Sequence, residues 1–259
     1  MDIQRSDDDA ASGIQWLKPD WPAADRVRAC SSLRAGGVSE GFFQSLNLGN
    51  HVNDDPDHVI QNRTRLQQAL ALPRQPVWLQ QRHGITVVNA ENSKNKAVAD
   101  ASWTDSSNIV CAVLTADCLP ILLCQRDGTR VAAVHAGWRG LAAGVIEAAC
   151  QAMACPADKL LAWLGPAIGP QAFEVGVEVR SAFLSYDAKA ISAFQATRAG
   201  HWYADLYCLA RQRLACCGVN AVYGGGFCTF SDPEHFFSHR RDGDIGVNTG
   251  RMATLIWLS

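Results

Sequence analysis

The stretch "TADCLPILLCQRDGTRVAAVHA", residues 115–136, contains two apolar runs separated by a short polar segment. The dipeptide Asp127-Gly128 lies between these runs, and Asp-Gly in this setting is the strongest short-range indication of a β-hairpin. A two-residue turn at this dipeptide would place Pro120 opposite His135 in the paired strands. The hairpin therefore fixes which side chains of the two strands share a face.

Cys118 is predicted to lie on the same face of this hairpin as His135. It precedes Pro120 by two residues, and side chains two residues apart point the same way in a strand. Diagonal partners have Cβ atoms about 7–8 Å apart or somewhat less, which lets two side chains reach one shared atom. Pro120 suits the start of a strand, where a missing N–H is tolerated. This convergence, beside the sequence "AGWRG" at 136–140, indicates a site rather than two unrelated core residues.

The residues alone leave three interpretations of Cys118 open. It can be a small core side chain, or the nucleophile of a Cys-His hydrolase with His135 as base. It can also be a metal ligand with His135 and with His83, which ends a predicted strand in "QQRHG". Two histidines and a cysteine with one open position are typical of catalytic zinc, where the pKa of a bound water falls to about 7. The same ligands suit copper, but seven histidines are too few for a four-copper centre.

The composition is that of an ordinary soluble globular protein with a sizeable core. Of 259 residues, 48% are hydrophobic and 19% charged, and the formal net charge of -2 gives no basic excess for a nucleic-acid backbone. No apolar run approaches the roughly 18 residues of a membrane span. The N-terminal "MDIQRSDDDAASG" is acidic, the reverse of a signal peptide, and the ten cysteines form no CxxC pair. We therefore predict a cytoplasmic enzyme with reduced thiols and with neither a nucleic-acid nor a membrane partner.

The pattern of apolar residues predicts one mixed α/β domain over residues 14–259, preceded by a disordered tail at 1–13. A glycine- and asparagine-rich loop is expected at 35–55 and a polar loop at 91–108. Helices are expected from Pro56, over about 141–150, near 176–185 and from Leu206, with Asp55 and Asp205 as N-caps. Strands are expected at 26–34, 76–81, 85–88, 108–116, 120–125, 131–136, 160–165, 221–226 and 252–258.

Six ordered blocks resemble the YfiH-type laccase-domain family, whose members have been called polyphenol oxidases and later purine nucleoside phosphorylase/adenosine deaminase enzymes. The resemblance runs from about Ser31 to the C-terminus, and six blocks in order are far more specific than any one motif. The blocks are "SLRAGGVSEGFFQSLNLGNHVNDDP", "WLQQRHG", "VCAVLTADCLPILL", "VAAVHAGWRGLAAGVIE", "WLGPAIGPQAFEVG" and "FFSHRRDG…TGRMATLIWL".

This resemblance implies a zinc site at His83, Cys118 and His135. It also implies a layered α/β/β/α fold with mixed sheets, similar to that of certain cysteine-dependent deamidating toxins. The implied activities are phosphorolysis of adenosine, inosine, guanosine and methylthioadenosine, and hydrolytic deamination of adenosine. In bacteria the family is also linked to editing of peptidoglycan precursors. The sequence departs from the family pattern at Arg82, at His239, where an aromatic residue is expected, and in a longer "DGDIGVNTG" segment.

Further site residues are expected around these ligands. Asp117 adjoins Cys118 but alternation directs it away, so it is a candidate for catalysis by orienting a ligand. Asn47 is a candidate for binding ribose or base, with capping of its own loop as the alternative. Guanidinium groups suit phosphate oxygens, and surface ion pairs are the competing interpretation. The candidate phosphate partners are Arg34, Arg139, Arg240 and Arg241.

Three alternatives to a zinc-dependent nucleoside enzyme remain open. The first is a hydrolase that edits UDP-linked peptidoglycan precursors, with Cys118 as ligand or nucleophile. The second is a copper-dependent phenol oxidase that uses the same three ligands. The third is a non-enzymatic protein that binds a metal or a partner. The oligomeric state is not predicted by any feature of the sequence.

Overall fold

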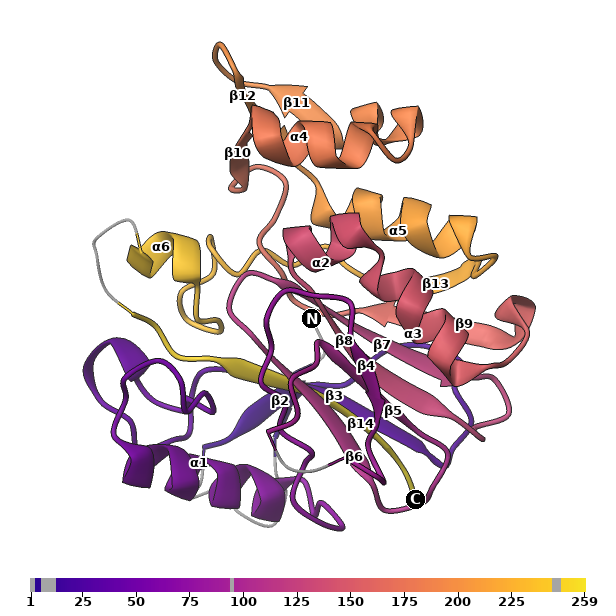
Figure 1. The fold of residues 1–259 in the computed structure, drawn as a ribbon. Coiled ribbons are helices and arrows are strands. Elements are labelled where there is room, and N and C mark those ends of the chain that lie inside the picture. The colour runs from indigo at the N-terminus through magenta and orange to yellow at the C-terminus, as the bar shows by residue number, and fades with distance from the viewer. Residues whose placement is uncertain (1–2, 6–12, 94–95, 244–247) are drawn as a thin grey trace.

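The computed structural model describes residues 3–5, 13–93, 96–243 and 248–259, and its strands form three sheets (Figure 1). The first sheet has the order β1-β2-β3-β14-β6, the second β13-β9-β7-β8-β5-β4 and the small third one β10-β12-β11. The strands are β1 (Ile3–Arg5), β2 (Gln15–Leu17), β3 (Val27–Ser32), β4 (Val87–Asn89), β5 (Ala101–Thr104), β6 (Val110–Thr115), β7 (Leu119–Gln125), β8 (Val131–Ala136), β9 (Leu160–Leu164), β10 (Glu174–Gly176), β11 (Phe194–Ala196), β12 (His201–Ala204), β13 (Ala221–Gly224) and β14 (Met252–Leu258).

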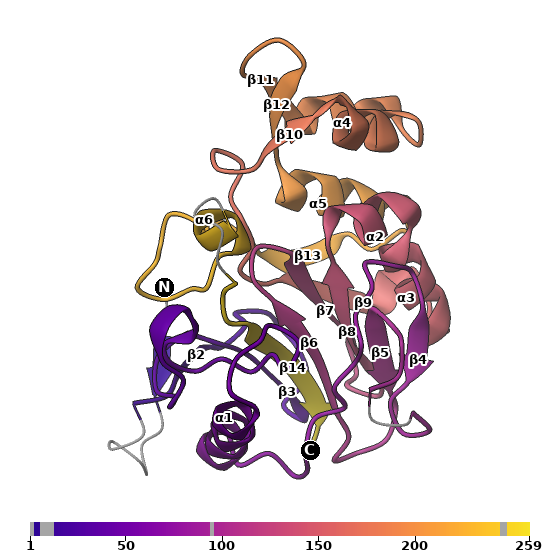
Figure 2. The same ribbon diagram turned by 60° about the vertical axis from the view of Figure 1, so that its left-hand side comes forward.

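Helices cover the outer faces of the two large sheets (Figures 1 and 2). Helix α1 lies against the first sheet, whereas α2, α3 and α5 cover the second. The α-helices are α1 (Pro56–Ala69), α2 (Trp138–Ala143), α3 (Val145–Met153), α4 (Val177–Leu184), α5 (Leu206–Cys216) and α6 (His239–Gly243). Short 3-10 helices are η1 (Gly41–Phe43), η2 (Ala157–Lys159) and η3 (Ala188–Ala193).

The side chains of β6 and β7 show how the layers are built. In β6, Val110, Ala112 and Leu114 pack in the core beneath α1, while Cys111 and Val113 pack in the core between the two large sheets. Strand β7 alternates in the same way between the inter-sheet core and the core beneath α2, α3 and α5. Both strands are therefore buried on both faces, which explains their nearly continuous apolar sequences. The predicted α/β/β/α layering is confirmed.

The register of the predicted hairpin is also confirmed, although its turn is longer than expected. Pro120 pairs with His135, and Cys124 pairs with Val131. The last bond of the ladder runs from the N–H of Gln125 to the carbonyl of Arg130, so four residues form the loop instead of two. Adding one residue to each side of a turn leaves the strand register unchanged, and the face shared by Cys118 and His135 is preserved.

Three other expectations about local structure were wrong. Residues 76–81 form two isolated bridges, Val77 to Cys111 and Gln80 to Val98, and not a strand. The polar segment 91–108 contains β5, because pairing with β8 and β4 outweighs its local composition. The single helix expected at 141–150 is two helices, α2 and α3, since Gly144 adopts the left-handed conformation with a φ of 107°.

The two predicted N-caps are confirmed. The carboxylate of Asp55 accepts from the N–H of Asp57, and that of Asp205 accepts from the N–H of Cys208. Gly218 follows α5 with a φ of 82°. The tail predicted at 1–13 lies mostly outside the described residues, and within it Ile3–Arg5 pair with β2. All ten cysteines are free thiols, and no described helix has the length and apolarity that crossing a membrane requires.

Candidate metal centre and its cavity

Two imidazoles and a thiol converge at one end of the two large sheets. Cys118 lies in the link between β6 and β7, His135 is in β8, and His83 is in the loop that precedes β4. The Sγ of Cys118 is 3.7 Å from the Nε2 of His83, and the rings of His83 and His135 are 4.8 Å apart in an edge-to-face arrangement. One donor atom from each residue lies within 4.8 Å of the other two. The group could therefore hold a metal ion.

The backbone around this group is unusual in two places. His83 has a φ of 59° and Asp117 a φ of 82°, values that cost free energy in residues other than glycine. Gly137 approaches so closely that a Cβ at its position would lie 2.6 Å from the His83 ring and 3.1 Å from the Sγ of Cys118. Only a residue without a side chain leaves the ring and the thiol in place. The local backbone is thus shaped around the three donors.

Asp100 is the carboxylate that orients the centre, and sequence reasoning missed it. Its Oδ1 is 2.8 Å from the Nδ1 of His135 and accepts from the N–H of His83 at 2.8 Å, while its Oδ2 accepts from the N–H of Gly84 at 2.7 Å. One buried side chain thereby fixes the ring of His135 and the loop that carries His83. Because Nδ1 is engaged by Asp100, the Nε2 of His135 is left to bind a metal.

Each charged group of the centre stabilises the charged form of its neighbours. Burial alone would raise the pKa of Cys118, but the imidazoles of His135 and His83 lower it to about 6. Burial alone would lower the pKa of His135, but the thiolate of Cys118 and the carboxylate of Asp100 raise it to about 9. Hydrogen bonds from His135, Gly84 and Arg82 hold the pKa of Asp100 below its usual value despite burial. The metal-free centre is therefore a thiolate beside an imidazolium at neutral pH.

We expect Cys118 to be alkylated first when metal-free protein is treated with iodoacetamide at pH 7. A thiol with a pKa of about 6 is mostly thiolate at that pH, whereas burial raises the pKa of Cys30, Cys111 and Cys124 to about 12. Peptide mass spectrometry would locate the adduct, and added zinc should suppress it. Faster labelling of the exposed Cys216 than of Cys118 would contradict this expectation.

The carboxylate of Asp117 does not occupy the ligand-orienting position that was expected for it. Its carboxylate accepts hydrogen bonds from the hydroxyls of Thr229 and Ser238 and from the N–H of Arg240, at 2.5, 3.0 and 2.6 Å. It therefore ties the segment 229–240 to the residue beside Cys118. No hydrogen bond joins it to a ligand of the centre among the described residues, where Asp100 takes the orienting position.

A cavity of about 340 Å³ opens above the centre. Its walls combine aromatic and apolar side chains with two guanidinium groups, and His83 and Cys118 lie in it. The lining residues are His83, Ala116, Asp117, Cys118, Trp138, Arg139, Ile168, Phe173, Leu206, His239 and Arg240. A mostly apolar cavity of this size with a few polar groups is typical of small-molecule sites. A second, charged trough shares Trp138, Arg139, Phe173 and Arg240 with it.

The structure separates the residues expected to bind substrate into two groups. Arg139 and Arg240 line the cavity, and the guanidinium of Arg240 also donates to the carbonyl of Glu174 at 3.1 Å. Arg34 and Arg241 are not among the lining residues, and they donate to other backbone carbonyls, Arg34 to those of Gln44 and Pro233. Asn47 is fully buried and bonds within its own loop and to the N–H of Arg251. Of the three departures from the family pattern, His239 lines the cavity, whereas Arg82 is exposed and does not. The longer "DGDIGVNTG" segment lies partly outside the described residues.

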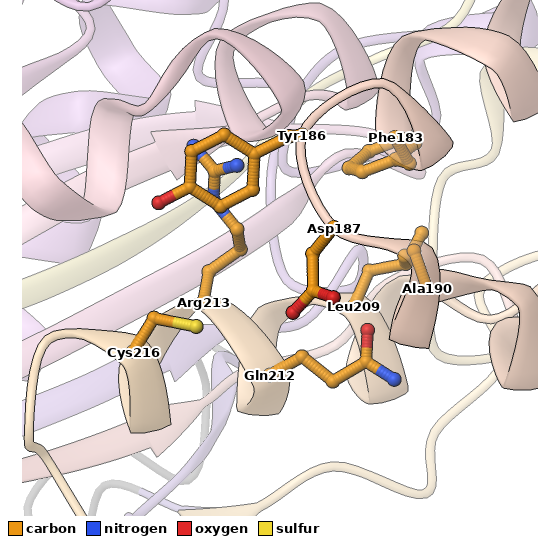
Figure 3. Close-up of a pocket in the computed structure, with 8 residues that line it drawn as sticks. All are labelled: Phe183, Tyr186, Asp187, Ala190, Leu209, Gln212, Arg213 and Cys216. Atoms are coloured by element: carbon orange, nitrogen blue, oxygen red, sulfur yellow. The ribbon is translucent and has the colours of Figure 1, made fainter.

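The cavity in Figure 3 is unrelated to this centre. It lies between the end of α4 and the outer face of α5, and the ring of Tyr186 stacks on the guanidinium of Arg213 beside it, 3.6 Å away. Its volume of about 10 Å³ leaves room for at most a single water. It is a packing feature of the helical layer.

A family described as multi-copper polyphenol oxidoreductase laccase matches residues 28–259. The chain belongs to this laccase family. A protein of Pseudomonas aeruginosa named purine nucleoside phosphorylase is 57% identical, over 94% of this chain and 98% of its own length. The purine nucleoside phosphorylase YfiH of Escherichia coli is 54% identical, over 93% of this chain and 98% of its own length. The predicted family resemblance is thereby confirmed.

Solved structures of the laccase family have the same fold. A crystal structure from Neisseria meningitidis is 50% identical with a TM-score of 0.90, over 94% of this chain and 99% of that one. The protein YlmD of Geobacillus stearothermophilus is 30% identical with a TM-score of 0.85, over 94% of this chain and 96% of that one. Among the described residues, His83, Cys118 and His135 form the single group that could hold a metal ion. The several copper ions that the family's description implies would need further ligand groups, and the described residues offer none.

Proposed function

We propose that this protein is a zinc-dependent purine nucleoside phosphorylase whose metal is held by His83, Cys118 and His135. The observation that carries the proposal is the convergence of these three donors beside a cavity large enough for a nucleoside, which His83 and Cys118 line. Relatives at 57% and 54% identity bear the name purine nucleoside phosphorylase, which supports the same substrate class. Free thiols throughout the chain support a cytoplasmic setting.

The chemistry of the donors fits a zinc ion, and the distance within one pair of them is close to what zinc requires. Donor atoms that share a tetrahedral zinc at the usual bond lengths lie about 3.3–3.6 Å from one another. The 3.7 Å between the Sγ of Cys118 and the Nε2 of His83 is close to that range. A thiolate, an imidazole nitrogen freed by Asp100 and a second imidazole form a donor set typical of catalytic zinc. A zinc ion held there would supply Lewis-acid chemistry.

The remaining cavity residues would bind the two substrates. The rings of Trp138 and Phe173 offer faces on which a purine can stack, with Ile168 and Leu206 completing an apolar wall. Arg139 and Arg240 offer guanidinium donors for phosphate at the junction with the charged trough. The family resemblance adds the individual nucleosides, and we propose inosine, guanosine, adenosine and methylthioadenosine as substrates.

Hydrolytic deamination of adenosine is a second candidate activity. It is favoured by the number of donors, because a zinc ion held by three protein side chains would keep a further position for water. The thiolate of Cys118 beside His135 equally suits a cysteine hydrolase acting on a peptidoglycan precursor, and the same donors suit copper. These alternatives differ in their products and in their metal requirement.

Anaerobic incubation of zinc-loaded protein with adenosine and phosphate tests the proposal. We expect adenine and ribose 1-phosphate, with inosine and hypoxanthine as further products if deamination also occurs. Formation of inosine as the only product would show that the protein deaminates adenosine and does not phosphorolyse it. Absence of all four products across the nucleosides named above would refute a purine nucleoside enzyme, and oxygen uptake with phenols after copper loading would favour the oxidase.

We expect Arg139→Ala to raise the KM for phosphate by about tenfold and to change the KM for inosine much less. Arg139 is exposed at the cavity rim and stacks on Trp138, so its loss removes a donor without disturbing the core. Arg65→Ala on α1 is the matched control, and steady-state kinetics with varied phosphate gives the comparison. An unchanged KM for phosphate would show that Arg139 does not bind phosphate.

A further inference from the structure

The cavity contains one titratable side chain that neither the metal centre nor the phosphate site uses. His83 and Cys118 are donors of the centre, and Arg139 and Arg240 cannot release a proton at neutral pH. The side-chain oxygens of Asp117 are already occupied, because they accept three hydrogen bonds. His239 is the remaining group, and an imidazole can both give and accept a proton near neutral pH.

The position of His239 is fixed from both sides. Its neighbours Ser238 and Arg240 donate to the same oxygen of Asp117, the Oδ2, at 3.0 and 2.6 Å. Asp117 in turn directly precedes Cys118, so the backbone of His239 is anchored beside the centre. The imidazole lines the cavity, and among the described residues it has no hydrogen-bond, ion-pair or ring-stacking partner. Within the described part of the chain, no residue therefore occupies its ring nitrogens, and a molecule in the cavity can bond to them.

Phosphorolysis of a purine nucleoside requires a proton donor of this kind. As the bond between C1′ and N9 breaks, its electron pair goes to the purine, which is a poor leaving group unless a proton reaches it. A phosphate oxygen forms the new bond to C1′. Histidine is the side chain that most often performs such proton transfers, which contribute about 10²–10⁴ to the rate.

We propose that His239 protonates N7 of the leaving purine, an inference that rests on the proposed phosphorylase activity. The imidazolium gives its proton to N7 as the C1′–N9 bond breaks. Monohydrogen phosphate still carries its own proton when it has formed the bond to C1′. The sugar phosphate then gives this second proton to the neutral imidazole, directly or through water. The products are the neutral base and ribose 1-phosphate, and His239 is again protonated.

A pair of substrates distinguishes a proton donor from a structural residue. Guanosine needs a proton on its base, whereas 7-methylguanosine already carries a positive charge and leaves without one. With zinc-loaded protein, we expect His239→Phe and His239→Gln to lower kcat for guanosine by about 100-fold and for 7-methylguanosine by less than about threefold. His58→Phe on α1, remote from the cavity, is the matched control and should change neither rate. Zinc content and thermal unfolding verify that each variant folds.

Free imidazole added to His239→Gly gives a second measurement, and it should restore turnover of guanosine but not accelerate 7-methylguanosine. Equal losses with both nucleosides, no loss with either, or no rescue by imidazole would each overturn the assignment of His239. Wild-type protein that releases base from neither nucleoside would overturn the proposed phosphorylase activity itself, and the role of His239 with it.

Discussion

Zinc-loaded protein carrying Cys118→Ala is expected to retain less than about a thousandth of the wild-type rate of phosphorolysis. The substitution removes one of three donors and also the thiolate charge that stabilises the imidazolium of His135 in the metal-free centre. Rates with inosine and phosphate, and zinc bound per chain, are the measurements. Cys216→Ala removes an exposed thiol on α5 and should change neither quantity.

The two histidines should give the same loss of activity but different losses of stability. His83 is exposed, so His83→Ala should lower the melting temperature little. His135 is buried and paired with Asp100, so His135→Ala leaves a buried carboxylate without its partner. This substitution should therefore lower the melting temperature clearly. Wild-type turnover by any of the three alanine variants would contradict the assigned metal centre.

Asp100→Asn is expected to weaken zinc binding by about 10–100-fold, although Asp100 touches no metal. Both carboxylate oxygens accept hydrogen bonds, from His135 and from backbone N–H groups of residues 82–84. An amide replaces one acceptor with a donor, which then faces other donors in a buried site. Chelator competition gives the affinity, and thermal unfolding gives the accompanying loss of stability.

The same variant should change the response of stability to pH. The pKa of Asp100 is held below its usual value in the folded protein, so its contribution to stability is present above that usual value and is lost as the pH falls through the folded-state pKa. Asp100→Asn should lose stability at neutral pH and show a weaker acid dependence. Asp105→Asn is the control, because among the described residues Asp105 forms a 3.7 Å ion pair with Arg130 and is not part of the centre. Similar zinc affinities in Asp100→Asn and Asp105→Asn would show that Asp100 does not orient the ligands of the centre.

The sequence predicted the part of the site that depends on local structure. Asp127-Gly128 and the alternation of apolar residues determine the register of one hairpin, and that register places His135 on the face that Cys118 shares. Neither inference needs knowledge of distant segments. The longer turn did not matter, because it preserves the register. The layering followed from family resemblance and agrees with the cores on both sides of β6 and β7.

Asp100 could not be found in this way, because its role depends on pairing between distant strands. Pairing of Ala101 with Val134 brings Asp100 next to His135, but the polar composition of 91–108 concealed β5. An aspartate directly before a short β-rich run such as "ASWT" was the available signal. The arginines posed a similar difficulty. Arg34 and Arg139 are equivalent by residue type, and only the fold shows that Arg34 binds carbonyls while Arg139 lines the cavity.

Titration of metal-free protein with zinc, under anaerobic conditions with inosine and phosphate present, tests the central claim most directly. That claim is that a metal held by His83, Cys118 and His135 is required to cleave purine nucleosides. Release of hypoxanthine should rise in proportion to added zinc and reach its maximum at one equivalent per chain. Full turnover by metal-free protein, unchanged by zinc or by a chelator, would contradict it.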